Sequence, residues 1–217
     1  IGVRLVGSEM CIRDRVWVYD SWLGTSEVPQ SNADPNGRVL SYADLEADWA
    51  QFNRSYIVLY EAEQETLVAE LLGTALDDAA MWQASLARAQ ADAAHDPTNA
   101  FYWFNLGTTY NTLGDYGKAA TAFDQALAIG LPWRMLWYQF GPYEAYQQIG
   151  RYDDVVFLAE TTLTDRPFFE ESYYYLGLAQ SALGDPQSAR ANLEKARELN
   201  PNFAPAEKAL AELTPEG

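Results

Sequence analysis

The chain has 217 residues, of which 48% are hydrophobic and 14% aromatic, so it can bury a sizeable core and is not expected to be disordered. Its 31 acidic and 14 basic side chains give a formal net charge of −17, which would repel phosphate backbones and anionic lipids. We therefore expect no nucleic-acid partner. Apolar runs such as YIVLY are far shorter than the roughly 20 residues of a membrane span, so we expect no span in this chain.

Residues 1–15 read IGVRLVGSEMCIRDR and follow neither the alternation of a strand nor the periodicity of a helix. The part LVGSEMCIRDR resembles translated sequencing-adapter sequence. We therefore expect residues 1–15 to be an artefact outside the fold, and the chain to be the C-terminal part of a longer bacterial protein. These residues include Cys11, the one cysteine, so the rest offers no thiolate ligand and no cysteine nucleophile.

Residues 16–73 indicate a mixed α and β unit. VWVYD (16–20) and RSYIVLY (54–60) predict two strands, the second of them buried, because both are rich in aromatic and branched residues. Between them, SWLGTSEVPQSNADPNGRVL predicts a long loop, and SYADLEADWAQF predicts a helix with Ser41 as its N-cap. EAEQETLVAELLG predicts a second helix, ending at Gly73. Two strands and two helices bury little, so we expect this unit to be truncated.

From Ala75 onward the sequence is alanine-rich, helical and repetitive. The glycines that separate the two expected helices of each unit, Gly114, Gly150 and Gly184, lie 36 and 34 residues apart. The units FYWFNLGTTYNTLGDYGKAATAFDQALAIGLP and YYYLGLAQSALGDPQSARANLEKARELNP share a pattern that resembles the tetratricopeptide repeat. Small residues such as Gly107, Ala119 and Ala126 would let the paired helices approach closely.

This resemblance implies a mainly α protein, in which an α-α superhelix of repeats follows a small truncated α/β remnant. One unit cannot bury its own apolar face, so several must stack. We expect a repeat domain at 75–214, with repeats at about 100–133, 136–167 and 170–201 and flanking helices at 77–94 and 204–213. In the middle unit, Pro142 follows Gly141 inside an expected continuous helix, and it predicts a bend in a helix through 134–148.

The resemblance also implies a concave groove lined by the first helix of each unit. The expected groove residues are Phe101, Phe104, Thr108 and Asn111; Trp137, Phe140, Glu144 and Gln147; and Glu171, Tyr174 and Leu178. The family's clamp for a terminal carboxylate would need Lys and Asn where Phe104 and Thr108 stand. An aromatic, acidic groove suits an extended apolar or basic segment of a protein or peptide. Alternatively, these aromatic residues pack against the N-terminal unit or a capping helix.

VWVYDSWLG, the loop after it and SYADLEADWAQFNRSYIVLY resemble the C-terminal half of papain-like cysteine peptidases of the bacteriocin-leader-processing type. The resemblance implies that Asp20 is the third member of a Cys-His-Asp set and orients the histidine. In that family the Cys and His precede this Asp, and Cys11 lies too close to Asp20 to be that nucleophile. We expect no peptidase activity from this chain. Alternatively, Asp20 caps the end of its strand.

Other candidates for chemistry have simpler explanations. The lone histidine, His95, and the acidic pairs near expected helix starts complement helix dipoles. The loop NADPNG lacks the glutamate of a calcium loop, and no phosphate-binding glycine motif occurs. We expect no metal and no cofactor. The leading hypothesis is a protein–protein interaction module; the alternative is a fragment of a cysteine peptidase whose Cys and His lie upstream.

Overall fold

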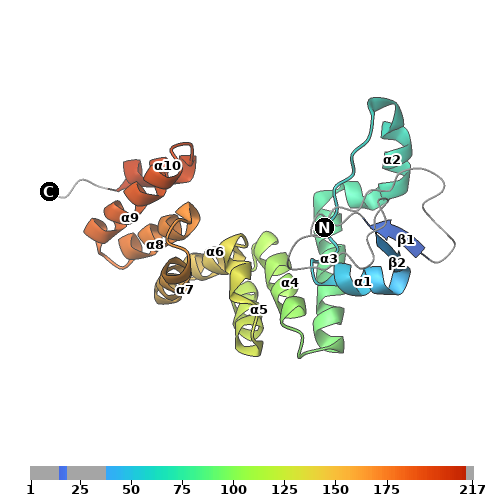
Figure 1. Cartoon of the computed structure of the whole chain (residues 1–217), viewed down its shortest axis with the longest axis horizontal. Coiled ribbons are helices and arrows are strands. Elements are labelled where there is room, and N and C mark those ends of the chain that lie inside the picture. Colours follow the sequence, from blue (N-terminus) through green and yellow to red (C-terminus); the bar gives the residue numbers. More distant parts are fainter. Residues whose placement is uncertain (1–14, 19–37, 214–217) are drawn as a thin grey trace. The chain divides into compact units, whose positions relative to one another are not determined.

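The structure is a computed structural model that describes residues 15–18 and 38–213. Its contacts divide the chain into two units, Ile1–Tyr60 and Glu61–Gly217. Helices dominate the described residues, and helices α3 to α10 follow one another through the second unit (Figure 1).

The first unit holds a two-stranded ribbon and one helix. Strand β1 (Arg15–Val18) pairs antiparallel with β2 (Arg38–Ser41), and helix α1 (Tyr42–Ala50) follows directly. The Ser41 hydroxyl accepts a hydrogen bond of 3.0 Å from the backbone N–H of Asp44, which confirms the predicted N-cap. The loop predicted through Leu40 therefore ends earlier, because its last residues belong to β2; residues 21–37 lie outside the described residues.

The prediction of a buried strand at 54–60 is wrong. Asn53 and Arg54 both have a φ of 53°, so the chain turns sharply after α1, and the indole N–H of Trp49 donates to the Ser55 carbonyl at 2.8 Å. The residues that follow are not assigned to a strand, and Ile57 and Leu59 are 88% and 91% exposed. Composition favoured an extended backbone, but a strand also requires a neighbouring strand, and the described residues supply none here.

The second unit begins with short helical segments. A 3₁₀ turn, Ala62–Gln64, leads into α2 (Glu65–Leu72), which ends at Gly73 as predicted. The backbone of Gly73 has a positive φ of 52°, which glycine adopts more readily than other residues do. A second 3₁₀ turn, Gly73–Leu76, precedes α3. The remaining elements are α3 (Asp78–His95), α4 (Ala100–Thr112), α5 (Tyr116–Ile129), a 3₁₀ helix (Trp133–Trp137), α6 (Gly141–Gln148), α7 (Tyr152–Asp165), α8 (Glu170–Ala182), α9 (Pro186–Leu199) and α10 (Ala204–Glu212).

Helices pack as the pairs α4–α5, α6–α7 and α8–α9. At the α4–α5 crossing, a Cβ added to Gly107 would lie only 2.6 Å from the ring of Phe123, so the absent side chain makes room for that ring. Phe123 is fully buried, and Ala119 and Ala126 beside it are also fully buried. The small residues therefore allow the close approach that the repeat pattern predicts.

Pro142 interrupts the middle unit in a different way from the predicted bend. No continuous helix runs through 134–148; a 3₁₀ helix ends at Trp137, and α6 begins at Gly141 with Pro142 in its first turn. A proline in the first turn sacrifices no intrahelical hydrogen bond, because the first N–H groups have no intrahelical partner. The chain thus starts a new helix at the proline instead of bending an existing one.

A polar network joins the first and second helix pairs. Arg151, which precedes α7, donates from Nη1 and Nη2 to the carboxylate of Asp124 on α5, at 2.7 and 3.1 Å, and from Nε to Asp154 at 2.7 Å. The guanidinium also lies 4.3 Å from the ring centre of Tyr146, whose hydroxyl donates to Asp124 at 2.7 Å. These contacts fix the position of α5 relative to α6 and α7.

Replacing Arg151 with alanine is expected to lower the free energy of unfolding by about 1 kcal/mol, because the side chains of Arg151 and Asp124 are 35% and 42% exposed and water screens their attraction. Chemical denaturation of the variant and the parent protein measures the difference. The exposed Arg190 on α9 provides the matched control. An equal loss in Arg190→Ala would contradict a specific role of the Arg151 network.

Candidate functional site

The first helices of the units form one connected face. The side-chain amide of Asn111 on α4 donates from Nδ2 to Oε2 of Glu144 on α6 at 2.8 Å. The hydroxyl of Tyr175 on α8 donates to Oε1 of the same carboxylate at 3.2 Å. Glu144 therefore links α4, α6 and α8, and the structure brings together two of the predicted groove residues, Asn111 and Glu144.

Aromatic rings continue this face from α6 to the start of α10. The ring of Tyr175 stacks on Tyr143 and on Phe140, with centroids 5.1 and 5.9 Å apart. Its neighbour Tyr174 meets Phe203, the residue before α10, edge to face at 5.5 Å. Edge-to-face and offset contacts of this kind stabilise beyond the area that they bury. The ring contacts thus run from Phe140 and Tyr143 through the neighbouring Tyr175 and Tyr174 to Phe203.

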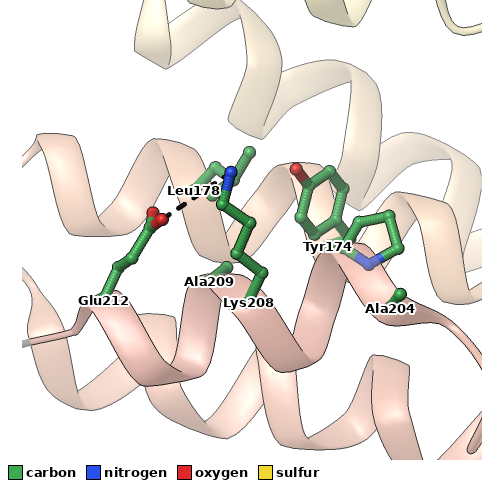
Figure 2. Close-up of a pocket in the computed structure, with 7 residues that line it drawn as sticks. Tyr174, Leu178, Ala204, Lys208, Ala209 and Glu212 are labelled. Carbon is green, nitrogen blue, oxygen red and sulfur yellow. Dashed lines mark ion pairs between the residues drawn. The ribbon is translucent and has the colours of Figure 1, made fainter.

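An open hollow of about 520 Å³ lies between α8 and α10 (Figure 2). Figure 2 shows Tyr174 and Leu178 from α8 opposite Lys208, Ala209 and Glu212 from α10. The lining residues are Tyr174, Leu178, Ala204, Pro205, Lys208, Ala209 and Glu212. Lys208 and Glu212 form a loose ion pair of 3.9 Å at the rim. The hollow combines apolar walls with a charged edge.

Most of the predicted groove residues are half-buried. These are Phe101, Thr108, Asn111, Trp137, Phe140, Gln147, Glu171, Tyr174 and Leu178, whereas Glu144 is exposed. Phe104 differs from them: it is only 4% exposed and packs on Phe123 at 5.2 Å, so it belongs to the core and not to the groove. Helical spacing places Phe104 on the correct helix, but the neighbouring α5 covers it.

Trp137 also departs from its expected position. It lies in the 3₁₀ helix before α6, so it is not part of the face of a first helix. Its ring contacts Phe169 at 5.9 Å, and the Arg166 guanidinium lies 4.6 Å from its centre. Because α6 starts only at Gly141, later than the repeat pattern assumes, Trp137 lies outside the helical register of that helix.

Sequence reasoning missed the contribution of α10 and of Tyr175, because it treats the segment 204–213 only as a flanking helix. Yet the 34-residue spacing that relates the second and third units also relates Glu171, Tyr174 and Leu178 to Pro205, Lys208 and Glu212, all three of which line the hollow. The repeat register itself is the signal that could have identified them.

Burial and nearby carboxylates raise the pKa of two neighbouring tyrosines on α8, Tyr174 and Tyr175. Burial raises the pKa of Tyr174, and the negative charges of Glu212 and Glu144 raise it further. Burial and Glu144 likewise raise the pKa of Tyr175. Burial also raises the pKa of Glu171, as does its neighbour Glu170. The Glu144 carboxylate on α6 thus acts on both phenols on α8, and the Glu212 carboxylate on α10 acts on Tyr174.

Asp20 lies outside the described residues, so its role in a peptidase triad stays a prediction. His95 is the exposed last residue of α3. In the described parts of the chain, no three His, Cys, Asp or Glu side chains are grouped to hold a metal ion. No helix there combines the length and apolar character needed to cross a membrane.

The paired helices and their connected face define an α-helical repeat protein, and comparison with known proteins agrees. Residues 102–129 and 170–203 of the chain each match the tetratricopeptide repeat family. Solved structures of MamA share the fold. The MamA protein of Desulfovibrio magneticus RS-1 superposes with a TM-score of 0.56 at 21% identity, over 71% of this chain and 85% of that chain. A further MamA crystal structure gives 0.53 at 16% identity, over 70% and 82%.

One curated relative is the protein CTR9 homolog of Arabidopsis thaliana. It is 29% identical over 127 residues, which are 58% of this chain. The aligned part is 12% of the relative, so the chain spans a small part of the length of that protein.

Proposed function

We propose that the chain is a protein-interaction module that binds an extended segment of a partner protein along the face of α4, α6, α8 and α10. The observation that carries the proposal is the hollow between α8 and α10, because it is lined at the positions that the repeat register assigns to a groove. The tetratricopeptide repeats support the same class of function.

The chemistry of the face favours an apolar or basic segment. Half-exposed aromatic rings offer large contact areas at low entropic cost, and such residues dominate many binding surfaces. The buried Phe104 cannot serve in a clamp for a terminal carboxylate, and the carboxylates of Glu144 and Glu212 would repel one. The partner would therefore bind through an internal segment and not through its C-terminal carboxylate.

A selection from a displayed library of random octapeptides tests this proposal. Peptides selected on the 217-residue protein should bind at least about tenfold more weakly to Tyr174→Ala, because that change removes a wall of the hollow. Phe157→Ala, which removes an exposed aromatic ring from the second helix α7, should leave affinity unchanged. Equal affinities for both variants, or a library without any binder, would contradict groove binding.

A further inference from the structure

The carboxylate of Glu144 carries a charge that its hydrogen bonds do not neutralise. Both of its donors, the Asn111 amide and the Tyr175 hydroxyl, are neutral groups. The Glu144 side chain is exposed, and no ion pair joins it to a cation within residues 38–213. A carboxylate that two neutral donors hold in one orientation is preorganised to accept a charge-assisted hydrogen bond from a cationic ligand.

Negative charge dominates the surroundings of Tyr174. Glu144 on α6 and Glu212 on α10 both act electrostatically on its phenol. Lys208, the one cation that lines the hollow, is 79% exposed and only 3.9 Å from Glu212 at its closest. The half-exposed rings of Tyr174 and Tyr175 meet at 5.1 Å beside these charges. Aromatic faces next to carboxylates attract a cation through both the ring quadrupole and the full negative charge.

We propose that this surface binds an arginine or lysine side chain of the partner segment beside Glu144 and Tyr174, while an adjacent apolar side chain enters the hollow at Leu178 and Ala209. The inference rests on the proposed function and specifies the partner as a segment that combines basic and apolar residues. Charge complementarity argues for this occupant, because the groove carboxylates outnumber the single lysine of the hollow. An acidic segment would meet repulsion from Glu144 and Glu212.

Fluorescence anisotropy with defined probes tests the proposal on the full 217-residue protein. The probes are labelled octapeptides that alternate leucine with arginine, or leucine with glutamine. The leucine–arginine probe should bind the parent protein more tightly than the neutral probe. Glu144→Gln removes the charge, keeps an amide oxygen that can accept from Asn111, and places an amide NH2 that can donate to the Tyr175 hydroxyl. This variant should bind the leucine–arginine probe about fivefold more weakly than the parent protein does. The neutral probe should bind that variant as well as it binds the parent.

The control is Glu160→Gln, which removes the same charge from an exposed position on α7. This substitution should change the affinity for either probe by no more than about twofold. An equal loss in both variants would show general attraction to the acidic chain and overturn the inference. If both probes bind the parent protein equally well and neither binds Tyr174→Ala, the requirement for a basic residue is overturned. Binding in the groove is then retained. If the probes bind Tyr174→Ala with the same affinity as the parent protein, both proposals are overturned. If the parent protein binds neither probe, this inference alone is overturned.

Discussion

Replacing Phe123 with alanine is expected to lower the free energy of unfolding by about 3–5 kcal/mol, among the largest effects of any single change in the repeats. The ring is fully buried, packs on Phe104, and fills the spaces left by Gly107 on α4 and Gly141 on α6. Its removal would leave a cavity between the first two helix pairs, because three helices cannot all collapse into the same space. Urea unfolding followed by circular dichroism measures the loss.

The control for this prediction is Phe157→Ala. Phe157 is also a phenylalanine on a second helix, but it is 62% exposed and touches Trp133 only edge to face at 6.3 Å. We expect a change of less than about 1 kcal/mol. A loss at Phe123 no larger than that at Phe157 would contradict the central position of Phe123 in the core.

Gly177 and Gly117 should respond in opposite ways to replacement by alanine. A Cβ on Gly177 of α8 would lie 2.8 Å from Leu193 Cγ and 3.0 Å from the backbone oxygen of Ala189, so α8 and α9 would have to separate. We expect a loss of about 1–3 kcal/mol, despite the higher helix propensity of alanine. A Cβ on Gly117 of α5 meets nothing within 4 Å, so Gly117→Ala should gain about 0.5–1 kcal/mol.

Thermal unfolding of the two glycine variants side by side measures this contrast. Both glycines lie within α-helices, so the same substitution separates backbone propensity from packing. Stabilisation by both substitutions would mean that α8 and α9 can move apart at little cost. That result would also weaken the assignment of Gly177 as the point of closest approach in the third unit.

Helix α10 contributes residues to the hollow, and this affects how far the surface formed by the repeats extends. Because Pro205, Lys208 and Glu212 follow the register of the third unit, α10 takes the place of a first helix and extends the face of α4, α6 and α8. Its small residues Ala206 and Ala209 are buried, and they let α10 approach closely enough to form the floor of the hollow. A segment that could have been only a closing helix thus contributes directly to the candidate binding surface.

Local and periodic signals in the sequence are sufficient to predict the repeat architecture and several helix boundaries. Glycines at regular spacing, small residues at helix crossings and the Ser41 cap each reflect a backbone requirement that the chain cannot avoid. The candidate groove residues Asn111, Glu144, Tyr174 and Leu178 are predicted from the same period. Their predicted positions depend only on counting along a helix, and their role in binding stays a prediction.

Packing between segments, in contrast, determines which residues are covered by their neighbours. Residues 56–60 have the composition of a strand but lack a pairing partner among the described residues, and Phe104 has groove spacing but is buried by Phe123. Pro142 marks a helix start because the preceding chain forms a 3₁₀ helix, which removes Trp137 from the expected face. In each case the local sequence allows several outcomes, and contacts between segments distant in the chain select one of them.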